Sequence, residues 1–243
     1  MLITKKHVFV HIPKTAGKAV LEFLVQGIPQ FTPHPDFVAL EWRNIRHLPL
    51  RERYQENKHK KIFCTIRNPW DWHVSKYFYN ILDGQGTRET LKAMGKDVDL
   101  GKTYEPPEAN KKFMSKNMFS EYIKFLFRTD SSEPDFQIPN VGQLTHAYFN
   151  MCAKQEIPKR VTKSFLYETH DNIIGVGKVI KMENLQDDLT EFLEVPKATI
   201  LEKNKNSIHR KHYSHYYDDE AREIIAEKES FIINKFDYDF EQQ

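Results

Sequence analysis

The sequence predicts an α/β protein in which helices flank a parallel sheet, forming a single domain over residues 1–243. An apolar strand followed by a helical pattern occurs three times, at residues 1–30, 60–82 and 173–193. Such repeats are typical of parallel sheets. The 243 residues are 40% hydrophobic, which is enough for a sizeable core in one domain. Two smaller domains are the alternative.

The first repeat has the features of an anion-binding site. The apolar run His7–Val10 ends at a turn that contains Pro13, Lys14 and Gly17, and a helical pattern follows. Such a turn directs backbone N–H groups toward one point, and the helix N-terminus adds partial positive charge. We expect Lys14 to supply a mobile charge and Gly17 to allow close backbone approach. An ordinary surface turn with solvated lysines is the alternative.

This turn departs from the P-loop of nucleotide-binding proteins. The P-loop needs a glycine five positions before its Gly-Lys pair and a hydroxyl directly after it to bind Mg²⁺. Those two positions hold Ile12 and Ala19. Because the magnesium ligand is missing and Pro13 stiffens the turn, we expect it to bind a smaller anion than a triphosphate.

The second repeat places an arginine at the end of a strand. Residues 61–66 form an apolar run, Arg67 follows directly, and Asn68 can cap a helix that begins at Pro69. Apolar residues recur at helical spacing at Trp70, Val74, Tyr77 and Ile81. Ser75 can face the same side as Arg67. Two such junctions side by side would hold a ligand with two separated anionic groups, unless Arg67 pairs with Asp71 instead.

The order of the motifs resembles that of one enzyme family. Residues 11–19 (His-Ile-Pro-Lys-Thr-Ala-Gly-Lys-Ala) are similar to the 5′-phosphosulfate loop, and residues 66–77 to the 3′-phosphate motif, of carbohydrate-type sulfotransferases related to the heparan 2-O-sulfotransferases and their bacterial relatives. Residues 179–185 resemble the family's Glu-Asn-Leu segment, and residues 204–217 its basic, tyrosine-rich loop. The ending, residues 236–240, is similar to the aromatic, strand-like tail of that family.

This resemblance implies a P-loop-like fold with a three-layer arrangement and a sulfotransferase activity. The implied enzyme moves a sulfuryl group in line from 3′-phosphoadenylyl sulfate (PAPS) to a hydroxyl acceptor, expected to be a carbohydrate, without a metal ion. The implied nucleotide contacts are Lys14, Thr15, Ala16, Gly17, Lys18, Ala19, Arg67, Ser75, Asn204, Ser207, His209, Arg210 and Tyr213. Lys18 and Ala19 replace family hydroxyls, but the backbone N–H groups survive and the Lys18 ammonium offsets the loss.

Two residues are expected to carry the chemistry. Lys14 would stabilise charge on the departing phosphate oxygen. The base would be a histidine, and His34, His47 and His59 lie between the first two motifs. We choose His47 because residues 46–53 resemble the family's histidine-containing stretch; a histidine that caps a helix or contacts backbone is the alternative.

Composition narrows the function classes further. A net charge of +2 does not suit a dedicated nucleic-acid binder. Two cysteines, Cys64 and Cys152, are too few and too far apart for a disulfide framework. There is no run of about 18 apolar residues that could span a membrane, and we expect no signal peptide because the first strand begins close to Met1. We therefore expect a soluble, cytoplasmic protein with no membrane partner. Interleaved cations argue against a metal site at His209, His212 and His215.

The remaining segments are assigned as follows. Residues 83–160 are expected to form an acceptor-binding or lid insertion, with loops at 83–112 and 128–142 around a helix at about 113–127. The third repeat has a strand at 173–182 and a helix at 187–193, and a long helix covers 218–236. Two rival functions remain: a magnesium-dependent P-loop kinase or NTPase, and an inactive nucleotide- or glycan-binding module.

Overall fold

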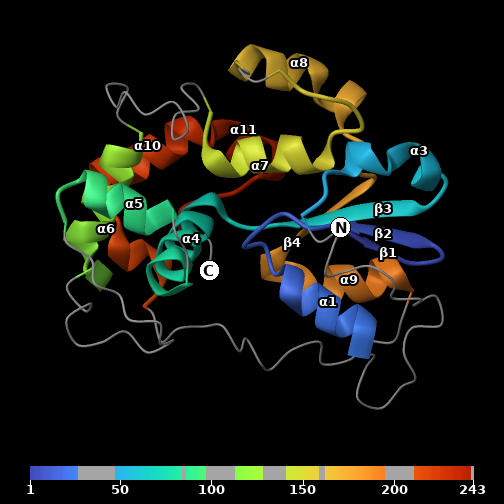
Figure 1. Ribbon diagram of the computed structural model, residues 1–243, viewed down its shortest axis with the longest axis horizontal. Coiled ribbons are helices and arrows are strands. Elements are labelled where there is room, and N and C mark those ends of the chain that lie inside the picture. Colours follow the sequence, from blue (N-terminus) through green and yellow to red (C-terminus); the bar gives the residue numbers. More distant parts are fainter. Residues whose placement is uncertain are drawn as a thin grey trace. The chain divides into compact units, whose positions relative to one another are not determined.

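The computed structural model describes residues 1–26, 47–83, 86–96, 113–127, 141–158, 162–194 and 211–241 (Figure 1). The chain divides into two compact units, and each unit is assembled from two separate segments. The first unit comprises Met1–Asn68 and Thr145–His209 and contains the sheet. The second comprises Pro69–Leu144 and Arg210–Gln243 and is helical in its described part.

The first unit confirms the predicted α/β class with a mostly parallel sheet. Its strands are β1 (Leu2–Ile3), β2 (His7–Val10), β3 (Lys61–Ile66) and β4 (Lys178–Lys181), in the order β1-β2-β3-β4. β1 runs antiparallel to β2, whereas β2, β3 and β4 are parallel. Because parallel strands end at the same edge of a sheet, the residues that follow β2, β3 and β4 come together there.

Helices of the first unit lie on both faces of the sheet (Figure 1). Helices α1 (Gly17–Gln26) and α9 (Leu185–Leu193) cover one face, and α7 (Gln143–Cys152) and α8 (Lys163–Ile173) lie on the other. The core on the first face is formed by Leu2, Phe9, Val20, Phe23, Leu24, Phe63, Ile180, Leu189 and Leu193. Covering both faces explains why β3 is apolar along nearly its whole length.

Short helical turns and one short helix complete this unit. The short helix α3 spans Tyr54–Asn57 and follows the 3₁₀ turn Leu50–Glu52. A second 3₁₀ turn, Met182–Asn184, connects β4 directly to α9. This turn places the Glu-Asn-Leu segment at the same sheet edge as the loop after β2.

The second unit is built from five helices in the part that the structure describes. They are α4 (Pro69–Asp83), α5 (Gly86–Ala93), α6 (Lys116–Leu126), α10 (Asp219–Lys228) and α11 (Ser230–Phe236). A 3₁₀ turn, Tyr213–Tyr216, precedes α10. Aromatic rings fill the interior of this unit: Tyr77, Phe78, Phe119, Tyr122, Tyr216 and Tyr217. As predicted, α4 begins at Pro69 and buries Trp70, Val74 and Tyr77; the side chain of Ile81 lies outside the described residues.

The second unit also contains a buried polar pair, His73 and Glu229, and the His73 ring contacts Trp72 and Phe127. His73 Nε2 lies 2.9 Å from Oε1 of Glu229, and the same oxygen accepts the Leu144 N–H at 2.8 Å. Burial lowers the pKa of His73, although the Glu229 carboxylate opposes that shift. Nearby, burial lowers the pKa of Lys76 to about 8. Within the second unit, Glu229 therefore connects α4 and the backbone at Leu144 to the junction between α10 and α11.

Several element boundaries differ from the predicted ones. The strand predicted at 173–182 is shorter, because Ile173 ends α8 and Ile174 pairs with Ala153 instead. The long helix predicted at 218–236 breaks at Glu229. Helix α5 occupies part of a predicted loop. The helix predicted at about 113–127 is confirmed as α6.

The aromatic tail is a turn rather than the strand-like segment that the family resemblance implied. Helix α11 ends because Asp237 adopts a left-handed conformation, with φ of 50°. The N–H of Tyr238 then donates to the carbonyl of Ile233 at 3.0 Å, which closes the helix end. Among the described residues no helix is long and apolar enough to cross a membrane.

Candidate functional site

The loop after β2 has an unusual backbone. Lys14 and Ala16 both have positive φ, 67° and 65°, a conformation that costs about 1–2 kcal/mol for a residue with a Cβ. Helix α1 begins immediately afterwards, and its first intrahelical bond runs from the Val20 N–H to the Ala16 carbonyl at 3.1 Å. Strained residues of this kind gather at binding sites, where the surrounding structure holds them in place.

A pair of threonines holds this loop against the sheet. Thr15 is buried in the loop, and its hydroxyl donates to the Ile12 carbonyl at 2.8 Å. Thr65 of β3, also buried, donates its hydroxyl to the Thr15 carbonyl, and the two hydroxyl oxygens lie 3.0 Å apart. The pair fixes the position of Lys14 relative to β3.

Replacing Thr65 with valine should lower the free energy of unfolding by about 1–3 kcal/mol, because the buried Thr15 carbonyl loses its donor without a change in side-chain shape. Urea unfolding measures the change. Thr190→Val is the matched control. Its buried hydroxyl donates to the Gln186 and Asp187 carbonyls, which already accept backbone N–H groups within α9. Equal losses in the two variants would contradict the proposed role of Thr65.

Two histidines lie beside the loop. The ring of His11, directly after β2, covers Gly17 so closely that an added Cβ on this glycine would overlap the imidazole. The ring of His47 stacks on His11, with 5.3 Å between ring centroids and an angle of 30° between the planes. His47 is exposed. The structure therefore brings the predicted base to the start of the predicted phosphate loop.

Residues after β3 and β4 complete this sheet edge. Arg67, directly after β3, donates from Nη1 to the Lys14 carbonyl at 3.4 Å. The Asn68 N–H donates to Oε1 of Glu183, in the turn after β4, at 2.7 Å. Two hydrogen bonds, Arg67 to Lys14 and Asn68 to Glu183, thus link the ends of the three parallel strands.

The charges at this edge suit an anion. Lys14 lies in the loop before α1, Lys18 is exposed in the first turn of α1, and the Arg67 guanidinium contacts the Lys14 carbonyl. The carboxylate of Glu183 is turned to the Asn68 N–H. No group of three or more histidine, cysteine or carboxylate side chains within the described ranges could hold a metal ion. These features fit a phosphate or sulfate bound by backbone N–H groups and basic side chains.

The other predicted nucleotide contacts belong to the second unit or fall outside the described ranges. Ser75, half-buried on α4, and Tyr213 belong to the second unit, and the Tyr213 hydroxyl donates to the Phe240 carbonyl at 2.6 Å. His59 is exposed in the turn after α3. The remaining predicted residues lie outside the described ranges: His34, Asn204, Ser207, His209 and Arg210.

Three residues of this site were not given roles from the sequence. His11 stands at the end of a strand, Thr65 is the one hydroxyl in the apolar β3, and Glu183 opens the Glu-Asn-Leu segment. Only Thr65 carried a local signal, since a hydroxyl buried in a strand needs a partner. The contacts of His11 and Glu183 depend on segments distant in sequence.

Comparison with protein-family models, with curated proteins and with solved structures gives no significant match for this chain.

Proposed function

We propose that this protein is a PAPS-dependent sulfotransferase that moves a sulfuryl group to a hydroxyl, on an acceptor that we expect to be a carbohydrate. The observation that carries the proposal is the meeting of Lys14, Arg67 and His47 at one sheet edge. An anion site alone would be compatible with many proteins that bind phosphate. His47, which is exposed and stacks on His11 beside this site, would in addition supply a general base.

Lys14 and the loop would bind the 5′ end of the donor. The first-turn N–H groups of α1 point along the helix axis, where they favour a phosphosulfate. The Lys14 ammonium would neutralise charge that grows on the phosphate oxygen as the sulfur–oxygen bond breaks. Arg67, held by the Lys14 carbonyl, would bind the 3′-phosphate of the same nucleotide.

His47 would take the acceptor's proton. As the acceptor oxygen forms its bond to sulfur, the hydroxyl proton passes to the imidazole, and adenosine 3′,5′-bisphosphate leaves with the electron pair of the broken bond. The His11 ring restricts His47 from one side, and Gly17 leaves the space that the His11 ring needs. His11 thus acts as a positioning residue in this scheme.

The alternative function, a magnesium-dependent kinase or NTPase, would need other residues at this site. A kinase or NTPase needs a hydroxyl after the glycine and a free carboxylate near the metal. Ala19 occupies the first position, and the described carboxylate at this edge, Glu183, already accepts the Asn68 N–H. Sulfuryl transfer needs neither feature.

Nucleotide preference tests the proposal. Adenosine 3′,5′-bisphosphate should bind much more tightly than AMP or ATP, with or without Mg²⁺, and Arg67→Ala should cost about 2–4 kcal/mol of bisphosphate binding because a charged contact is lost. Isothermal calorimetry measures both. Lys58→Ala, an exposed cation of the same unit, is the control that should change nothing. Equal affinity for AMP, or a magnesium-dependent preference for ATP, would reject the sulfotransferase assignment.

A further inference from the structure

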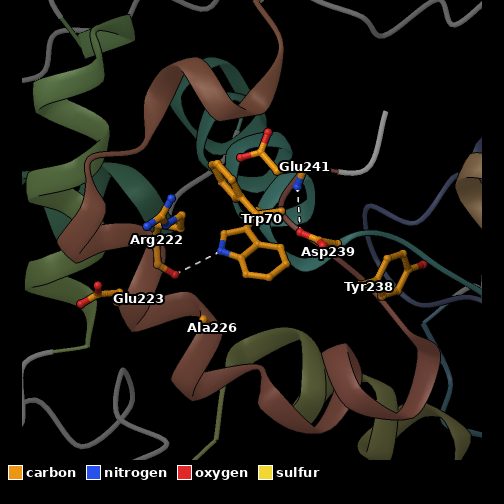
Figure 2. A pocket seen from close by; sticks show the side chains of 8 residues that line it. Trp70, Arg222, Glu223, Ala226, Tyr238, Asp239 and Glu241 are labelled. Atoms are coloured by element: carbon orange, nitrogen blue, oxygen red, sulfur yellow. Dashed lines mark hydrogen bonds between the residues drawn. The ribbon is translucent and has the colours of Figure 1, made fainter.

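A hollow in the second unit opens between the start of α4, α10 and the tail after α11, and the groups that line it already contact one another (Figure 2). Trp70 is only 4% exposed, and its indole N–H donates to the Arg222 carbonyl at 3.1 Å. The Arg222 guanidinium lies over the Phe240 ring, 5.6 Å from its centroid. These contacts hold α4, α10 and the tail together, and we assign the hollow a structural role.

The histidine pair beside the loop after β2 differs from this hollow, because its titratable rings lie against the proposed anion site. The His11 ring is half-buried and packs between two other rings: Phe9, with 6.1 Å between centroids, and His47, with 5.3 Å. His11 also lies so close to Gly17 that a Cβ added there would be 2.1 Å from the imidazole Nε2. The ring nitrogen is therefore held at the first residue of α1.

The position of His11 at the start of a helix disfavours a proton on its ring. The N-terminus of α1 carries partial positive charge, and Gly17 is its first residue. The basic residues Lys14 and Lys18 flank this helix end and act in the same direction. An anion bound to the loop would cancel part of this positive charge. The same anion would therefore favour the protonated imidazole.

The other charged groups on the elements around the histidine pair include two carboxylates, each with a partner of its own. Glu183 accepts the Asn68 N–H at 2.7 Å. Glu52 lies 3.4 Å from Nε of Arg51 in the turn that follows His47. The described cations of these elements are Lys14, Lys18, Arg51 and Arg67. The net charge of these described groups is positive, which favours the neutral imidazole until an anion binds.

We propose that His11 takes up a proton when a sulfate or phosphate group binds to the loop after β2, and that the charged ring then donates a hydrogen bond to this anion. The inference rests on the anion site of the proposed function, and it adds a ligand and a pH dependence to that site. Because proton uptake and anion binding are linked, each must strengthen the other. The affinity for the anion should therefore rise as the pH falls.

The stacking of the two rings gives them different roles. Two protonated imidazoles with centroids 5.3 Å apart repel each other, so a proton on one ring disfavours a proton on the other. A proton held on His11 by the anion would keep His47 neutral, which is the form that a general base needs. In the proposed reaction, the affinity for the donor would then fall with rising pH while kcat rises.

Sulfate tests the proposal in the unmodified protein, because it stays a dianion while histidines titrate. The NMR signals of ¹³C-labelled histidine rings are followed against pH in sodium sulfate and in sodium chloride of equal ionic strength, and His11→Gln identifies the His11 signal. The midpoint of the His11 titration should lie about 0.5 to 1 pH unit higher in sulfate. His59, exposed in the same unit, is the internal control and should titrate alike in both salts. An equal change at His59 would mean that sulfate acts on the general charge of the protein, and the proposal would be wrong.

The affinity for sulfate, taken from the sulfate dependence of the same spectra, provides the second measurement. It should be about three- to tenfold tighter at about pH 6 than at about pH 8. His11→Phe keeps a ring against Gly17 and His47 and should remove most of this pH dependence. Sulfate binding with an unchanged His11 midpoint, or with an equal pH dependence in His11→Phe, would overturn the proposal and leave the anion site intact. Spectra that do not respond to sulfate at either pH would contradict the anion site itself, and the proposed function with it.

Discussion

Replacing His47 with alanine should leave an almost inactive enzyme that still binds adenosine 3′,5′-bisphosphate normally. A general base contributes about 10²- to 10⁴-fold to the rate, and the proton that it removes belongs to the acceptor rather than to the nucleotide. In the unmodified protein the rate should rise with pH as the imidazole loses its proton. Steady-state kinetics across pH, with calorimetry of the bisphosphate, measures both effects.

Variants of three other histidines provide the controls for this prediction. His59→Ala removes an exposed imidazole of the same unit and should leave turnover unchanged, as should His34→Ala. His11→Phe keeps a ring against His47 while removing the second imidazole. If His47→Ala keeps most of its turnover while one of these variants loses it, the base has been assigned to the wrong residue.

Lys14→Ala should lower kcat by about a hundredfold or more, the scale expected for one preorganised donor at a developing charge. Its effect on bisphosphate affinity should be much smaller, because the charge that Lys14 meets is fully developed only in the transition state. Comparing kcat with the bisphosphate dissociation constant separates these two quantities.

Lys18→Ala is the matched control for the Lys14 variant. Lys18 is exposed in the first turn of α1, so its removal should weaken nucleotide binding through lost attraction and leave kcat nearly intact. A Lys14 variant that loses affinity and kcat to the same extent would make Lys14 a binding residue with no special role in the transition state.

The sheet was predictable because its signals are local. Residues 7–10 and 61–66 are apolar runs that stop at polar turns, and Pro69 marks the start of a helix from sequence alone. The strand β4 was harder to delimit, because Ile173 and Ile174 are as apolar as the strand itself. Whether they continue the strand depends on a tertiary partner, Ala153, which no local pattern reveals.

Interior polar contacts explain the missed helix boundaries. The apolar spacing from Ala221 to Ile232 continues smoothly through Glu229, so the sequence predicts one helix. The structure breaks it there, where the buried Glu229 carboxylate accepts the Leu144 N–H and contacts His73. From sequence alone, a single charged residue within an amphipathic helical pattern is expected to be exposed. The buried hydrogen-bond partners of Glu229 could not be predicted.

The basic residues of the candidate site could be predicted from the sequence, but the contacts that hold them in place could not. Lys14 and Arg67 follow strands directly, so their meeting at one edge follows from parallel topology. The stack of His47 on His11 brings together residues separated by a long connection, and the Thr15–Thr65 pair bridges two strands' ends. These contacts depend on three-dimensional packing, and no local sequence pattern predicts them.

Transfer of ³⁵S from labelled PAPS tests the central claim most directly. The protein is incubated without Mg²⁺ in the presence of glycans, lipids and small phenols, beside the His47→Ala variant as the inactive control. The sulfotransferase proposal predicts labelled acceptor, with glycans preferred, and an equal amount of adenosine 3′,5′-bisphosphate from the unmodified protein alone. No labelled product from any acceptor, together with magnesium-dependent release of phosphate from ATP, would contradict the proposal.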